Sequence, residues 1–227
     1  MFFDLRIRIF VFFISLIVSS SVSKSADIDS LYKEFDRARD LQEKSKLYSS
    51  IIQHYFYLNM DSVHHYSNEM LKYGESNRNY YIQAEAYNNA ATAHLLGANY
   101  EQAYKNYHKS MMISKALNQK DFMVQVISNM GNIFAWQNMF DSARFYYLKS
   151  IEESEKISNK KELFNGYYNL GAVYQSEAKY PESNKHFTES LKYYYEEIDS
   201  SRLSAAYNNI AIHYYYMGNY PSAIDYF

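Results

Sequence analysis

Asn129-Met130-Gly131-Asn132-Ile133-Phe134 and Asn169-Leu170-Gly171-Ala172-Val173-Tyr174 are two versions of one segment, 40 residues apart. The same step relates Phe140-Asp141-Ser142-Ala143 to Tyr180-Pro181-Glu182-Ser183. Further out, it aligns Asn89-Ala90-Ala91 with Asn209-Ile210-Ala211. Self-similarity at a fixed period of this length is the signature of a repeat array. The sequence therefore predicts stacked supersecondary units. In such an array the length of the chain reflects the number of repeats and not the number of domains.

Each repeat is predicted to contain two helices, because small and apolar residues recur at helical spacing. In the second helix, one face carries residues at offsets of 4, 7 and 8 from a small residue, which is the spacing of a buried stripe. The stripes are Ala103, Tyr107, Ser110 and Met111; Ala143, Tyr147, Ser150 and Ile151; and Ser183, Phe187, Ser190 and Leu191. Pro181 and Pro221 share one repeat position, in the first helical turn, where the missing N–H of proline costs nothing.

The register places every expected helix. First helices are expected over 80–96, 122–137, 163–177 and 202–217, and second helices over 101–117, 141–157 and 181–198, with a last one starting at Pro221. A charged, helix-prone stretch over 27–46 predicts one opening helix, and a degenerate first pair follows with its first helix over 46–58. The expected organisation is the opening helix and degenerate pair over 26–79, then repeats near 80–119, 120–159, 160–199 and 200–227.

The last repeat stops early in its second helix, on an aromatic residue that aligns with Tyr107, Tyr147 and Phe187. Helices this short are marginal in isolation, and arrays need a polar terminal repeat. We therefore expect either a longer reading frame or a partner that supplies the missing helix, with self-association through the incomplete repeat as one form of this.

The N-terminus predicts export. Arg6 and Arg8 precede an apolar run over 9–18, and a serine-rich stretch of small residues follows over 19–23. This order of charged, apolar and small residues is typical of a secretory signal peptide, here over residues 1–25. An uncleaved N-terminal anchor is the alternative, although a membrane span needs about 20 apolar residues. The expected location is the periplasm, with membrane contact only through this segment if it stays uncleaved.

Composition excludes several classes of function. The net charge of −2 removes the electrostatic basis for nucleic-acid binding. The absence of Cys removes disulfides, thiolate metal sites and a cysteine nucleophile. His64-His65 near Glu69 is the only sequence cluster that hints at a metal, and an adjacent pair without ligands at helical spacing predicts exposed histidines instead. The chain has no glycine-rich phosphate loop and no nucleophile elbow, so we expect no enzyme, no cofactor and no metal.

The motif Tyr167, Asn169-Leu170-Gly171, Tyr174, Tyr180, Ser183 and Phe187 resembles the tetratricopeptide repeat (TPR). In that family an aromatic residue, Asn-Leu-Gly and another aromatic residue lie in the first helix, and a turn aromatic, a small residue and an aromatic residue lie in the second. The period of 40 departs from the usual 34. The family's proline at the end of the second helix is also missing, and longer second helices would explain both departures. This long, Tyr-rich form resembles exported sensor segments of bacterial signalling proteins.

The resemblance implies an all-α fold, a right-handed α-solenoid of antiparallel helix pairs whose first helices line a concave groove. It also implies that the repeated Asn can hydrogen-bond a bound peptide backbone. The residues expected to line a partner-binding groove are Asn89, Asn129, Asn132, Trp136, Tyr168, Asn169, Gln175, Asn208, Asn209 and Tyr215. The other interpretation of the repeated Asn stays open: it can be a satisfied buried polar group that ties neighbouring helices together.

The leading hypothesis is a non-catalytic scaffold that binds a protein or peptide, as the exported sensory or adaptor part of a signal-transduction system. The groove lacks the Lys and Arg with which proteins it resembles hold a terminal carboxylate, so that mode of binding is not expected. The alternative is an exported carbohydrate-binding module that uses aromatic rings of the groove.

Overall fold

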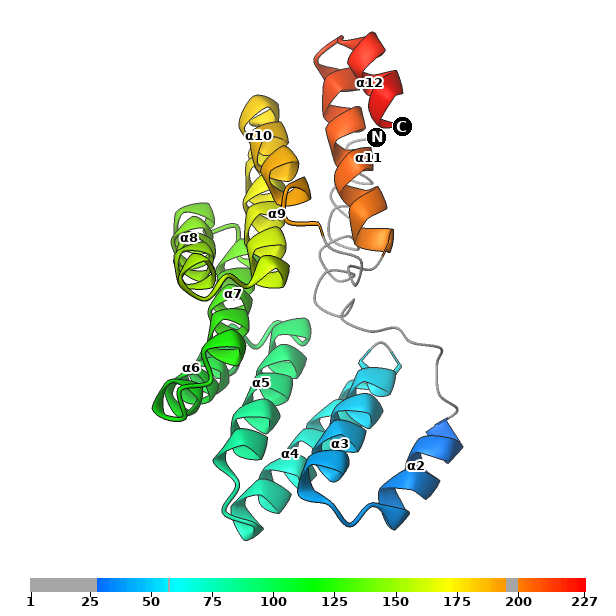
Figure 1. Cartoon of the computed structure of the whole chain (residues 1–227), viewed down its shortest axis with the longest axis vertical. Helices are drawn as coiled ribbons and strands as arrows, with labels where there is room; N and C mark the ends of the chain where they lie inside the picture. The colour runs from blue at the N-terminus through cyan, green and yellow to red at the C-terminus, as the bar shows by residue number, and fades with distance from the viewer. Residues whose placement is uncertain (1–27, 57, 195–199) are drawn as a thin grey trace. The chain divides into compact units, whose positions relative to one another are not determined.

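The computed structural model describes residues 28–56, 58–194 and 200–227, and over these ranges the chain forms eleven α-helices and no β-strand (Figure 1). Within each unit consecutive helices pack against one another, as α4, α5 and α6 do in one and α8, α9 and α10 in the other, which confirms the all-α repeat fold. The expected signal peptide over 1–25 lies outside the described residues. The second helix expected over 181–198 was predicted too long, because α10 ends at Leu191 and the described residues 192–194 are not helical.

The chain divides into two compact units. The first ends at Ile133 and contains α2 (Ile28–Arg37), α3 (Leu41–Tyr55), α4 (Met60–Ser76), α5 (Tyr80–Leu96), α6 (Tyr100–Ala116) and most of α7 (Lys120–Trp136). The second begins at Phe134 and contains the end of α7 with α8 (Phe140–Ile157), α9 (Lys160–Ser176), α10 (Tyr180–Leu191), α11 (Ser200–Tyr216) and α12 (Tyr220–Tyr226). From α5 onward, each helix starts at or just before the position that the 40-residue register predicts.

One turn geometry repeats between the helices and explains the length of the repeat. Among the described residues, positive φ in the left-handed region recurs at intervals of 20 from Arg78 through Ala98, Asn118, Asn138 and Ser158 to Ala178, and again 40 residues later at Gly218. At Ala98 the flanking bonds are those of a Schellman motif, with Asn99 N–H donating to His94 O (2.7 Å) and Ala98 N–H to Leu95 O (2.9 Å). The helices from α5 to α9 are nearly equal in length, with 17 residues in α5, α6, α7 and α9 and 18 in α8, whereas α10 has 12. Two such helices and two identical turns make the repeat longer than the usual one.

The residue after the left-handed position is often an asparagine that also starts the next helix. The Oδ1 of Asn79 accepts from Ile82 N–H at 3.1 Å, and the Oδ1 of Asn159 accepts from Glu162 N–H at 3.0 Å. Each side chain satisfies one of the free N–H groups at a helix N-terminus. A single residue therefore ends one helix and begins the following one, which keeps the turn short.

The opening of the chain differs from the prediction. A single helix over 27–46 was expected, whereas α2 ends at Arg37 and α3 starts at Leu41. The break has a local cause: the Asp40 carboxylate accepts from the N–H groups of Gln42 and Glu43, both at 2.9 Å, and so caps a new helix. The first helix of the degenerate pair is accordingly α3 and begins before Lys46.

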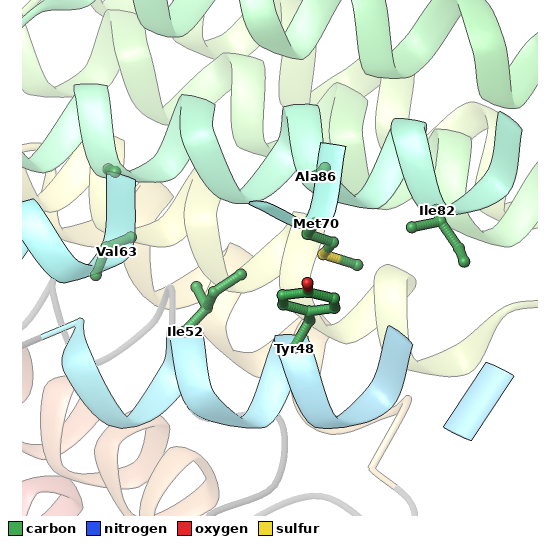
Figure 2. Close-up of a cluster of buried hydrophobic side chains, with 7 residues drawn as sticks. Tyr48, Ile52, Val63, Met70, Ile82 and Ala86 are labelled. Carbon is green, nitrogen blue, oxygen red and sulfur yellow. The ribbon is translucent and has the colours of Figure 1, made fainter. Parts of the chain in front are cut away.

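The core of the first unit lies where α3, α4 and α5 meet. Tyr48 and Ile52 project from α3 toward Val63 and Met70 of α4, and Ile82 and Ala86 of α5 belong to the same cluster (Figure 2). All six side chains are buried. Burial of apolar side chains of this size contributes about 1.5–3 kcal/mol each. The degenerate pair is therefore packed against the first regular repeat as a full member of the array.

The buried stripe predicted for the second helices is confirmed, and its polar members have partners. In α6, the hydroxyl of Tyr107 is fully buried and lies 2.8 Å from Thr92 Oγ1 of α5. Ser110 Oγ donates to the Ala84 carbonyl oxygen at 2.7 Å. Small hydroxyl residues at these positions therefore let the two helices approach closely without leaving a buried polar atom unsatisfied.

In the second unit the Asn-Leu-Gly motif marks the closest approach of α9 to α10. A Cβ atom built on Gly171 would lie 2.8 Å from Cδ1 of Phe187. Ser183 Oγ donates to the Gly171 carbonyl oxygen at 2.7 Å across the same contact. The proline predicted at the start of a second helix is confirmed in α10 and α12. The glycine of the motif is thus required by the ring that packs over it.

Candidate partner-binding surface

The repeated asparagines lie on the first helices of the pairs, and in the first unit they connect one first helix to the next. Asn129 Nδ2 of α7 donates to Asn88 Oδ1 of α5 at 3.0 Å. Asn89 Nδ2 has only a weak contact with the Met70 sulfur, at 3.8 Å. Asn89 and Asn129 are both half-buried. The two residues therefore differ: Asn129 ties helices together, and Asn89 keeps most of its hydrogen-bonding capacity.

The second unit contains the same connection two repeats further along the chain. Asn209 Nδ2 of α11 donates to the Tyr168 hydroxyl of α9 at 3.2 Å. The donor and acceptor are again 41 positions apart in the sequence, as for Asn129 and Asn88. A register position that recurs with the same bond in both units has a structural role, which supports the interpretation that the repeated Asn ties neighbouring helices.

The expectation that Tyr168 lines an open surface is wrong. Its side chain is 1% exposed, and its ring packs edge-on against Phe187 with 5.0 Å between centroids. Burial raises the pKa of its hydroxyl. The physical reason is its register position, which faces the following first helix, so that a large ring there becomes part of the core.

The other predicted residues fall into three groups by exposure. Asn132, Asn169 and Asn209 are each 7% exposed and belong to the interior. Trp136 and Gln175 are half-buried, and Asn208 and Tyr215 are exposed. Of the ten residues predicted to line a groove, the accessible ones are therefore Asn89, Asn129, Trp136, Gln175, Asn208 and Tyr215. Because they belong to both units, each unit presents its own part of the candidate surface.

Sequence reasoning missed the position four residues before the repeated Asn. It is occupied by Glu85, Gln125 and Asn165, one polar residue in each of α5, α7 and α9, and all three are half-buried. The 40-residue register contained this signal, since the position is polar in three successive repeats. Glu85 is the charged member of the series.

Glu85 has an unusual environment for a carboxylate. Ser45 Oγ of α3 donates to its Oε2 at 2.6 Å, and the Tyr81 hydroxyl also hydrogen-bonds to it. Burial is the largest influence and raises the pKa of the carboxyl group, while the two hydroxyl donors oppose that shift. Burial likewise raises the pKa of Tyr81 to about 12.

The two adjacent histidines that were expected to be exposed have different surroundings. His64 of α4 contacts His94 of α5, with 4.5 Å between ring centroids, whereas His65 is exposed. Burial is the larger cause that lowers the pKa of His94, and the nearby His64 is the smaller one.

Within the described ranges, no group of three or more His, Cys, Asp or Glu could hold a metal ion. Among those same residues, no helix combines the length and apolar character needed to cross a membrane.

Comparisons with known proteins identify the type of repeat and the fold. Residues 162–227 match the family model for the tetratricopeptide repeat. No curated protein sequence matches the chain. The resemblance seen in the sequence is thus confirmed for the last two repeats by the family model, and the fold of the chain is that of TPR-like helical repeat proteins, as the following structures show.

Solved structures with the same fold are distant in sequence. BtubC (BKLC) from P. vanneervenii superimposes with a TM-score of 0.72 at 17% identity, over 91% of this chain and 89% of that one. A Rap protein complexed with Competence and Sporulation Factor gives 0.69 at 13% identity, over 88% of this chain and 67% of that one. Aspartyl phosphate phosphatase F from Bacillus subtilis gives 0.67 at 15% identity, and although the match covers 88% of this chain, it spans 62% of that one.

Proposed function

We propose that this chain is a non-catalytic scaffold that binds a protein or peptide through the first helices of its repeats. The observation that carries the proposal is the polar stripe on these helices, in which interhelical bonds such as Asn129 to Asn88 hold the amides in fixed positions. Preorganised donors and acceptors lower the entropic cost of ordering a flexible segment. An extended peptide offers complementary backbone groups at regular spacing.

The shared fold supports this proposal. The Rap protein of the same fold was solved in complex with Competence and Sporulation Factor, so a TPR-like array of this kind can hold a binding partner. For this chain we propose the role of an exported sensory or adaptor part of a signal-transduction system. Its partner would be recognised outside the cytoplasm.

The decisive experiment separates binding from structure within the asparagine series. The full chain is screened against an array of extended peptides, and the best binder is titrated by calorimetry. Asn89→Ala should weaken that binding about fivefold or more while leaving the melting temperature close to that of the wild type, because within the described residues its side chain makes only the long contact to the Met70 sulfur. Asn129→Ala is the matched control: it removes the bond to Asn88 and should lower the melting temperature.

Two outcomes would contradict the proposal. If neither the peptide array nor a pulldown with extracts finds a peptide or protein that binds, the proposed class of partner is wrong. Catalytic turnover by the purified chain would remove the non-catalytic assignment.

The second candidate function is carbohydrate binding, and one observation in the second unit favours it. Tyr215, Tyr216 and Tyr220 are each more than half exposed, and their rings adjoin, with centroids 5.5 Å apart for Tyr215 and Tyr220 and 6.0 Å apart for Tyr215 and Tyr216. Exposed aromatic faces of this kind can stack on sugar rings. Binding on a glycan array, together with failure on the peptide array, would favour this function over the first.

Export is the proposal for location. It rests on the charged, apolar and serine-rich order of the first residues, with Arg6 and Arg8 ahead of the apolar run. N-terminal sequencing of the mature protein should begin near Lys24 or Ala26. Recovery of an intact Met1 in the cytosolic fraction would refute it, whereas an intact Met1 in the membrane fraction would establish the anchored form.

A further inference from the structure

Glu85 is a half-buried carboxyl group that forms no ion pair with any described residue of its unit. Its carboxylate is bonded by the hydroxyls of Ser45 and Tyr81, and no Lys, Arg or His among the described residues contributes to its charge balance. Partial burial of a charged carboxylate costs free energy unless a group of opposite charge lies beside it. A neutral amide would accept the same two hydroxyl donors without that cost.

The neighbouring repeats show that the fold does not require a charge at this position. Gln125 and Asn165 occupy it in α7 and α9, and both carry neutral amides. The carboxylate of Glu85 is therefore not explained by packing or by the repeat register. It is explained if a cation from outside the chain completes the site.

One aromatic ring interacts with this carboxylate, and a second ring lies next to the first. Tyr81, whose hydroxyl bonds to Glu85, is 38% exposed, and its ring centroid is 6.0 Å from that of the half-buried Phe122 of α7. A cation over the face of an aromatic ring is stabilised by the ring quadrupole. Elsewhere in this unit the same preference is already realised, since Lys109 Nζ lies 4.9 Å from the Tyr87 ring centroid.

We infer that Glu85, Tyr81 and Phe122 form a binding point for a cationic side chain of the partner, with a guanidinium group as the best fit. The planar guanidinium can donate two hydrogen bonds to one carboxylate and stack on an aromatic ring at the same time, which an ammonium group cannot do. This inference rests on the proposed peptide-binding function and deepens it, because it assigns the partner a basic residue that reaches α5.

The site can be tested without knowing the partner. The probe is the capped tripeptide acetyl-Gly-Arg-Gly-amide, titrated into the full chain carrying ¹³C-labelled tyrosine, with the Tyr81 ring signal identified by its loss in Tyr81→Phe. Saturable shifts of that signal in the millimolar range are expected. The same peptide with citrulline, which keeps the shape but not the charge, should shift it at least about fivefold less at equal concentration.

The variant Glu85→Gln should weaken binding of the arginine tripeptide by about fivefold or more. Its amide oxygen still accepts a hydrogen bond from Ser45, so the fold is retained. Glu75→Gln, at an exposed glutamate of α4, is the matched control and should leave the titration unchanged. Equal shifts from arginine and citrulline would overturn the inference. So would an arginine titration that Glu85→Gln does not alter.

The peptide array distinguishes this inference from the proposed function. Binders enriched in Arg or Lys that lose affinity in Glu85→Gln support both. Binders without basic residues, or binders unaffected by Glu85→Gln, leave the peptide-binding function standing and overturn the cation site. An array with no binders at all removes the function, while the tripeptide titration still reports on the site itself.

Discussion

His213 of α11 is completely buried, and its imidazole is only half satisfied. Its Nδ1 lies 2.7 Å from Asn184 Oδ1 of α10, whereas Nε2 has no hydrogen-bond partner among the described residues. The rings of Tyr180 and Phe187 pack beside it, with centroids 5.0 Å and 5.9 Å away. Burial lowers the pKa of His213 to about 4. The contact between α10 and α11 therefore requires a neutral histidine, and we predict that mild acid destabilises it.

Proton linkage gives the sign and the size of the change in the free energy of unfolding. Because the folded pKa lies below the unfolded value of about 6.5, the unfolded chain binds a proton between these pH values that the folded chain does not. The free energy of unfolding is therefore unaffected above about pH 7 and falls as the pH drops toward 4. With a folded pKa of about 4, the loss due to His213 reaches about 2 kcal/mol at pH 5 and levels off near 3 kcal/mol.

The assay is urea unfolding at pH 7.5 and pH 5.0, with amide hydrogen exchange in α10 and α11 as a local readout. The test variant is the double substitution His213→Leu and Asn184→Leu, which removes both partners together and so leaves no single polar group stranded. Its loss of stability between the two pH values should be about 2 kcal/mol smaller than that of the wild type. His65→Leu, at an exposed histidine, serves as the control. Identical acid losses in the wild type and the double variant would refute the reasoning.

Three further predictions concern stability. Gly171→Ala should cost about 1–3 kcal/mol in urea unfolding, because the new Cβ meets the Phe187 ring, whereas Gly97→Ala, where the nearest atom is a carbonyl oxygen at 3.5 Å, should cost less than half of that. Ala178→Gly should raise the free energy of unfolding by about 0.5–1 kcal/mol, since Ala178 has a φ of 58°, and a loss instead would contradict the strain argument. Tyr107→Phe should lose about 0.5–1.5 kcal/mol by removing the hydroxyl pair with Thr92 Oγ1, which keeps its own bond to the Asn88 carbonyl oxygen, and Thr92→Val should cost less in that variant than in the wild type; an equal cost in both would show that the hydroxyl pair is not the cause.

The helix pairs and their buried faces could be predicted from the sequence because they depend on local spacing. The stripe that begins at Ala103, Tyr107 and Ser110 recurs every 40 residues, and one face of a helix fixes which of its residues are buried. Pro181 likewise identifies a first helical turn without knowledge of any neighbour. The break before Leu41 was missed although its cause, the capping residue Asp40, is local, because the charged residues on both sides favour helix equally.

The candidate site was decided by tertiary structure. The register placed Tyr168 and Asn208 at equivalent positions, yet Tyr168 is buried and Asn208 is exposed, because exposure depends on how neighbouring helices pack over that position. The environment of Glu85 depends on Ser45, a residue 40 positions earlier that only the packing of α3 against α5 brings within hydrogen-bonding distance. Periodicity specifies the face of a single helix, whereas exposure and charge balance are properties of the contact between helices, and that contact exists only in the assembled array.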